Sequence, residues 1–130
     1  MSFIAIEEAA GVCPPPEPYS HAIRTDNTIY LAGQVSLDES GSVVGRTTTE
    51  QARQVWRNIS LVLQAAGASI SDIVKVTYYM QDIREIAEEI EIRKEIFIGR
   101  PFPAVTAIQA AALGLPGLRM EVDVIAVVSE

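Results

Sequence analysis

One carboxylate near the end of the chain is placed where it could do acid–base chemistry. Residues 120–128 alternate along a predicted strand, so that Glu121 shares a face with Ile125 and Val127. A carboxylate among aliphatic neighbours loses hydration, which raises its pKa toward a value useful for proton transfer. The alternative is that Glu121 is an ordinary surface carboxylate at the end of a strand, in contact with water. The pattern makes Glu121 the first candidate for a catalytic residue.

Three further residues could form the wall of a small-molecule pocket. Tyr19 follows Pro18 at the end of a proline-rich loop, where its phenol could donate a hydrogen bond or simply pack. Gly33 ends an apolar segment and is followed by Gln34. A glycine lets the main chain approach a ligand closely, although it could equally mark a kink in a strand. From the residue types alone, a pocket wall and ordinary packing both remain open.

The chain has few histidine and cysteine residues that could bind a metal or act as a nucleophile. Cys13 and His21 are the single cysteine and the single histidine of the chain, which is too few for a metal site with these ligands. We therefore expect no metal cofactor. A catalytic Cys13–His21 pair ranks low, and a lone histidine more often packs than catalyses. A single cysteine forms no internal disulfide, which fits a reducing compartment.

Charge and composition narrow the classes of partner. The 130 residues carry a net charge of −7 with only two lysines, Lys75 and Lys94, which disfavours binding to nucleic acid. No apolar run reaches the roughly 20 residues of a membrane span, and no signal peptide is recognised at the N-terminus, so we expect a cytoplasmic protein. The apolar content of 48% and the mean hydropathy of +0.21 favour an oligomer.

The periodicity predicts a single α+β domain over residues 1–130, with strands and helices in the order ββαβαββ and both helices on one side of a mixed sheet. Thr47 and Glu50 have capping-box spacing, and Gly67 stands where a helix ends. Asp82 and Glu85 repeat that spacing before a second helix, with Ile86, Ile90 and Phe97 facing inward. The predicted segments are an edge strand at 3–6, an extended loop at 13–18, a hairpin of 19–24 and 28–33, helices at 48–66 and 82–98, and strands at 73–80, 104–110 and 120–128.

Several motifs together resemble one known family. The resemblance to the YjgF/RidA family of reactive intermediate deaminases covers nearly the whole chain, from Pro18 to Val127. It is carried by Arg100-Pro101-Phe102-Pro103-Ala104-Val105-Thr106, Glu17-Pro18-Tyr19-Ser20, Leu31-Ala32-Gly33-Gln34 and Arg119-Met120-Glu121-Val122-Asp123.

That resemblance implies a chorismate-mutase-like fold and a homotrimer with sites in the clefts between subunits. It also implies hydrolysis of a reactive imine or enamine acid to a keto acid and ammonia, without a metal or organic cofactor. Glu121 matches the glutamate that orients the attacking water, and Tyr19 matches the pocket tyrosine. The main chain of Ala32, Gly33 and Gln34 would line the substrate site, and Glu91 stands roughly where an asparagine lies at the pocket edge.

One position departs from the family pattern. Val105 stands where the arginine that binds the substrate's carboxylate is expected, which forfeits about 1.5–3 kcal/mol of charge-assisted bonding. The leading prediction is therefore a hydrolase or deaminase whose substrate is not a simple 2-imino acid. One alternative is an ordinary 2-imino acid deaminase in which Arg24, Arg100 or Arg119 replaces the missing arginine. Another is a non-catalytic trimer that binds a metabolite or a protein partner.

Overall fold

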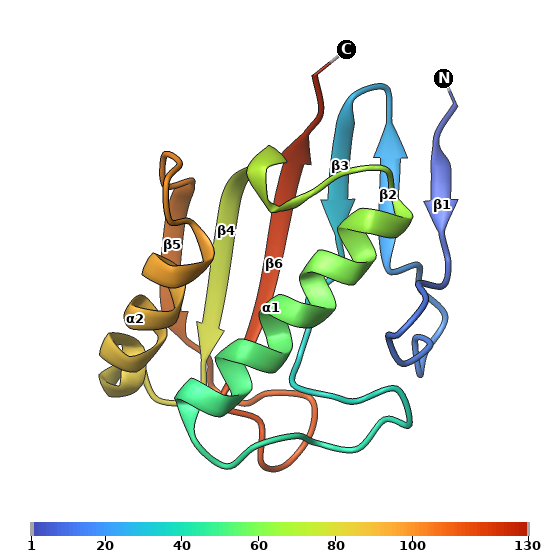
Figure 1. Ribbon diagram of the computed structural model, residues 1–130. Coiled ribbons are helices and arrows are strands. Elements are labelled where there is room, and N and C mark those ends of the chain that lie inside the picture. The colour runs from blue at the N-terminus through green and yellow to red at the C-terminus, as the bar shows by residue number, and fades with distance from the viewer. Residues whose placement is uncertain (1, 130) are drawn as a thin grey trace.

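The last strand of the chain runs into the middle of the sheet and places Glu121 there. The computed structural model describes residues 2–129, and its six strands form one mixed sheet in the order β1-β2-β3-β6-β4-β5 (Figure 1). β6 pairs antiparallel with both β3 and β4, whereas β5 runs parallel to β4 at one edge. The strands are β1 Ile4–Ile6, β2 Ala22–Thr25, β3 Thr28–Leu31, β4 Ile73–Met80, β5 Ala104–Gln109 and β6 Met120–Val127.

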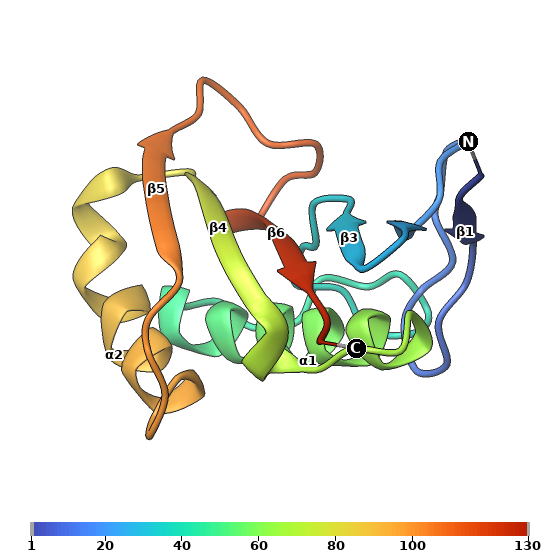
Figure 2. The same cartoon turned by 90° about the horizontal axis from the view of Figure 1, so that it is seen from above.

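Both helices lie on the same face of this sheet, as predicted (Figure 2). α1 spans Thr48–Ala65 and α2 spans Ile86–Ile96, and short 3-10 turns occupy Ile70–Asp72 and Ile83–Glu85. We call the sheet face beneath the helices the helix face and the other one the open face. No helix within residues 2–129 is long and apolar enough to cross a membrane.

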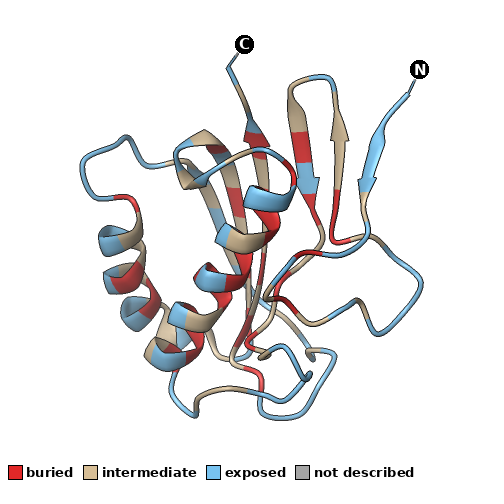
Figure 3. Cartoon of the chain, turned by 45° about the vertical axis from the view of Figure 1, so that its right-hand side comes forward, coloured by how far each residue is buried: buried red, intermediate tan, exposed pale blue. Residues whose placement is uncertain are grey.

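The first helix forms as its sequence predicts. The Glu50 amide donates to the Thr47 hydroxyl at 3.1 Å, and the Thr47 amide donates to the Glu50 carboxylate at 3.1 Å, which completes the capping box. Gly67 has a φ of +83°, so that it ends the helix in the left-handed conformation. The stripe that faces the sheet is buried along its length (Figure 3): Ala52, Val55, Trp56, Ile59, Val62 and Leu63.

The second helix differs from the prediction. Asp82 caps the 3-10 turn by accepting from the Arg84 amide at 3.0 Å, and the α-helix begins only at Ile86. This change of helical pitch alters which side chains turn inward, because a 3-10 turn has fewer residues per turn than an α-helix. Phe97 is buried as predicted, but Ile86 and Ile90 are only half-buried, and Glu89 is fully buried.

The hairpin strands are shorter than predicted. β2 begins at Ala22, so Tyr19 and His21 belong to the preceding loop, and β3 ends at Leu31, before Gly33. The prolines upstream explain the late start, because they cannot donate hydrogen bonds to a neighbouring strand.

Cross-strand partners identify which residues share the open face. Glu121 pairs with Tyr79, Asp123 with Thr77, and Ile125 with both Tyr30 and Lys75. The neighbouring residues of β6, Met120, Val122 and Val124, point to the helix face and are buried. The predicted alternation of residues 120–127 is therefore confirmed.

Candidate functional site

The Glu121 side chain lies directly against the main chain of Gly33. A β-carbon added at Gly33 would stand 2.7 Å from Cδ and 2.8 Å from Cγ of Glu121. A two-way bridge fixes the neighbouring residues, because Gln34 N donates to Val122 O at 2.8 Å and Val122 N donates to Gln34 O at 3.0 Å. The structure thus brings together two of the residues that the sequence proposed for the site.

Tyr19 lies at the surface, where the charge of Glu121 acts on its phenol. The residue is 43% exposed, and burial raises the pKa of its phenol, as do the charges of Glu17 and Glu121. The ring makes an edge contact with His21, at 6.4 Å between centroids. The phenol therefore stands at the surface within the electrostatic reach of Glu121.

The electrostatics of the open face favour a protonatable carboxylate. Burial raises the pKa of Glu121, and the neighbouring charge of Asp123 raises it further. Burial likewise raises the pKa of Asp123, although the Lys75 ammonium acts in the opposite direction. The charge of Asp123 in turn raises the pKa of Tyr79. Glu121 is thus tuned toward acid–base work at higher pH than a glutamate in water.

Asp123 and Tyr79 were not proposed as site residues from the sequence. The alternation of residues 120–128 already placed Asp123 on the face of Glu121. The pairing of Tyr79 with Glu121 required the register of two strands that are not adjacent in sequence.

His21 and Gln34 are buried, and their side chains form hydrogen bonds with the main chain of Cys13 and Ala32. His21 Nε2 lies 2.8 Å from Cys13 O, and the Gln34 amide nitrogen lies 3.3 Å from His21 Nδ1. Both side chains are buried, and the Gln34 amide also donates to Ala32 O at 3.2 Å. His21 therefore packs, as predicted, and the Gln34 side chain orders the 32–34 main chain. The adjoining cavity of about 30 Å³ has room for about one water molecule.

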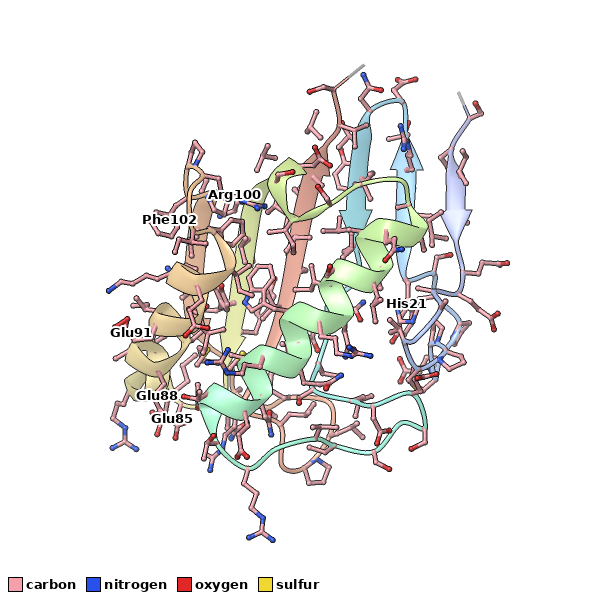
Figure 4. All side chains as sticks on the ribbon, viewed as in Figure 1. His21, Glu85, Glu88, Glu91, Arg100 and Phe102 are labelled. Carbon is pink, nitrogen blue, oxygen red and sulfur yellow. The ribbon has the colours of Figure 1, made fainter. Side chains whose placement is uncertain are left out.

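Within one chain, Val105 and Glu91 do not lie at the same site as Glu121. Val105 pairs with the buried Val76, so its side chain points to the helix face, opposite to Glu121. Glu91 is exposed on α2, where its carboxylate lies 3.3 Å from the Lys94 ammonium. Figure 4 shows Glu91 and His21 on opposite sides of the molecule. Glu121 and Val105 therefore lie on opposite faces of the sheet.

The three arginines proposed as substitutes all lie away from Glu121. Arg24 donates to Ala66 O at 2.9 Å and so caps the end of α1. The Arg119 guanidinium lies 3.3 Å from the Glu85 carboxylate, at one end of the sheet. Arg100 is exposed on the loop between α2 and β5, near Phe102 (Figure 4).

A fourth arginine, not considered from the sequence, shares the face of Val105. The Arg93 guanidinium lies 4.8 Å from the ring centroid of Tyr78, a helix-face residue whose β5 partner is Ala107. The four-residue spacing of Glu89 and Arg93 on a helix could have suggested an ion pair. Nothing local to the sequence indicated that the pair faces the sheet. Within residues 2–129, no group of three or more His, Cys, Asp or Glu side chains could hold a metal ion.

Comparisons with known proteins agree with this architecture. The family model described as Endoribonuclease L-PSP matches residues 12–128. The 2-iminobutanoate/2-iminopropanoate deaminase of Mus musculus is 41% identical over 111 residues, which are 85% of this chain and 81% of that protein. The human deaminase of the same name is 39% identical over 111 residues, 85% of this chain and 80% of that protein.

Solved structures show the same fold. A Rid family protein of unknown function from Yersinia pestis superposes with a TM-score of 0.92 at 32% identity, covering 98% of this chain and 100% of that one. The structure of E. coli TdcF with bound serine superposes with a TM-score of 0.89 at 26% identity, covering 97% of this chain and 100% of that one.

Proposed function

The chain belongs to the Endoribonuclease L-PSP family, the superfamily of the RidA/YjgF deaminases, and on that basis we propose that it hydrolyses a small imine or enamine to a carbonyl compound and ammonia. The observation that carries the proposal is the half-buried Glu121 carboxylate, held against the Gly33 main chain.

The arrangement suits addition of water to a carbon–nitrogen double bond. The Glu121 carboxylate accepts a hydrogen bond from water, orients its oxygen toward the electrophilic carbon and takes up its proton. The resulting carbinolamine receives a proton on nitrogen, which leaves as ammonia while the carbon–oxygen double bond forms. The Tyr19 phenol can donate a hydrogen bond to the substrate, and the 32–34 main chain limits its position. Overall, one imine and one water give one carbonyl compound and one ammonia.

We further propose that the active species is a homotrimer with its sites between subunits. The open face carries exposed apolar side chains that a monomer leaves in water, including Tyr30, Ile108 and Val127. The positions of Glu121 and Val105 on opposite faces favour the same arrangement, because only a neighbouring copy could add the Val105 region to the Glu121 site.

A small molecule fits this site better than the RNA that the family description names. Glu121 and Asp123 place two carboxylates together on the open face, and the chain carries a net charge of −7. Both features repel a phosphate backbone, whose binding depends on cationic groups.

The test is the decay of freshly generated 2-iminopropanoate in the presence of the purified protein. We expect the wild type to accelerate the decay and Glu121→Gln to lose at least about a hundredfold of that acceleration, because the amide cannot accept the proton. Glu88→Gln, on the exposed side of α2, is the matched control and should keep full activity (Figure 4). Binding of pyruvate without acceleration by the wild type would favour the non-catalytic binding protein instead.

A further inference from the structure

An ion pair is buried between α2 and the sheet. Glu89 has no exposed side-chain surface, and only 16% of the Arg93 side chain is exposed. Arg93 engages the carboxylate with one edge of its guanidinium: Nη2 donates to Oε1, and Nε donates weakly to Oε2 at 3.4 Å. Taking two charges out of water costs about as much free energy as their mutual attraction returns, so a buried ion pair is weak evidence for a purely stabilising role.

The other edge of the same guanidinium is free. Nη1 of Arg93 has no hydrogen-bond partner in the described part of the chain. The fully buried side-chain atoms that lack a partner there are Trp56 Nε1 and Tyr78 OH, so Nη1 of Arg93 keeps contact with solvent. Because a guanidinium has donors on both edges, it can bind Glu89 and a second carboxylate at once.

Two neighbours hold this guanidinium in place. Glu89 fixes its inner edge, and the Tyr78 ring lies 4.8 Å from its carbon in a cation–π contact. The Tyr78 hydroxyl is buried and has no hydrogen-bond partner within residues 2–129. Burial raises the pKa of this phenol, and the charge of Glu89 raises it further. Arg93 is thus oriented before any ligand arrives, which lowers the entropic cost of binding one.

The location matches the gap in the family motif. Val105 and Ala107 on edge strand β5 are the partners of Val76 and Tyr78, and all four side chains point to the helix face. Val105 and Ala107 bring no charge to this edge of the sheet. The Arg93 guanidinium contacts one member of this set, Tyr78.

We propose that the free edge of Arg93 binds the carboxylate of the substrate, with Glu89 as a positioning residue. This inference rests on the proposed function and deepens it: the substrate is an acid, despite the valine at position 105. Because Arg93 and Glu121 lie on opposite faces of the sheet, Arg93 of one subunit would hold the carboxylate while Glu121 of a neighbour acts on the imine.

The test measures binding calorimetrically with pyruvate and with methyl pyruvate, which has the same skeleton without the negative charge. We expect the wild type to prefer pyruvate and Arg93→Lys to weaken pyruvate binding by roughly ten- to a hundredfold, because an ammonium cannot form the two parallel hydrogen bonds. Methyl pyruvate binding should not change. Arg53→Lys, in the exposed Arg53–Glu95 pair, is the control and should leave both ligands unaffected.

A second variant guards against a folding defect. Glu89→Leu combined with Arg93→Met removes both charges together, and such apolar replacements of buried pairs are often tolerated. We expect it to bind methyl pyruvate as the wild type does and to lose the preference for pyruvate. The proposal is overturned if either variant binds pyruvate normally, or if the wild type shows no preference for pyruvate.

Failure of this inference and failure of the proposed function give different results. Glu121→Gln should abolish turnover while keeping pyruvate affinity, because it does not touch the carboxylate subsite. An active Glu121→Gln protein would refute the water-activating role of Glu121 and leave Arg93 in place. Loss of turnover in Glu121→Gln with normal pyruvate binding in Arg93→Lys would refute only the Arg93 proposal.

Discussion

The Glu121 carboxylate occupies the space that a side chain at Gly33 would need. Its Cδ and Cγ atoms would lie 2.7 and 2.8 Å from an added β-carbon, distances that real β-carbons do not tolerate. The glycine is therefore required by close approach of another side chain, and its backbone φ is not in the left-handed region. Because residue 33 has no side chain, the Glu121 carboxylate can lie against the Gly33 main chain.

Gly33→Ala should displace the Glu121 side chain. We expect activity to fall at least about tenfold and the free energy of unfolding to fall by about 1–3 kcal/mol, the usual cost of overpacking. Imine decay rates and urea denaturation would measure the two effects. Gly114→Ala is the matched control, because a β-carbon there would meet no atom within 4 Å. Full activity in Gly33→Ala would show that the contact between the Glu121 side chain and the Gly33 main chain is not needed for activity.

Asp123→Asn should shift the pH dependence of activity. The working form of Glu121 is the carboxylate, so activity falls as pH drops through its raised pKa. Removing the Asp123 charge removes the smaller cause of that rise and leaves burial, the larger one. The acidic limb of the kcat/KM profile should therefore move to lower pH without reaching that of a free glutamate. An unchanged or upward-shifted limb would contradict the assignment of this limb to Glu121.

Val105→Arg should add a second cation to the region of Arg93. In the Arg93→Lys background we expect it to restore pyruvate affinity by about tenfold or more, because a new guanidinium on the same sheet face can form the parallel hydrogen bonds. Val105→Met adds length without charge and should restore nothing. Calorimetric titration with pyruvate would compare Arg93→Lys alone with the double variants that add Val105→Arg or Val105→Met. Equal pyruvate affinities of the two double variants would argue against a carboxylate subsite at this edge of the sheet.

Tyr30→Asp should break the assembly. Tyr30 is 48% exposed on the open face beside Ile125. In the proposed trimer a neighbouring copy covers this face, so that a carboxylate there would be buried without a partner. Light scattering should give roughly 42 kDa for the wild type, three times 14.1 kDa, and the mass of one chain for the variant. Ile98→Asp, on the loop after α2, should stay assembled. A wild type of 14.1 kDa in solution would refute the trimer.

Thr47→Ala should destabilise α1 without affecting the site directly. The alanine removes the side chain that accepts from the Glu50 amide, which costs about 0.5–2 kcal/mol at a helix N-cap. Thermal unfolding would measure the loss. Thr49→Ala, one position inside the helix, should change stability much less, and equal losses in both variants would contradict the cap as the cause.

Much of the fold could be predicted because its determinants are local. The capping box at Thr47 and Glu50 and the left-handed Gly67 bound α1 through contacts within a few residues. The alternation of β6 placed Glu121 and Asp123 on one face, since side chains of a strand alternate whatever it pairs with. The second helix was less predictable, because the buried Glu89 depends on a partner and on the sheet beneath it.

The sequence by itself identified the candidate site residues, Glu121 with Tyr19 and the 32–34 main chain, and it has a valine at position 105. Only the tertiary structure decided that Glu121 packs on Gly33, that Val105 lies on the opposite face, and that Arg93 contacts Tyr78 on the same face as Val105. The physical reason is that alternation assigns faces within one strand. Which face of one strand joins which face of another depends on strand order and pairing register, and both are fixed by contacts between distant parts of the chain.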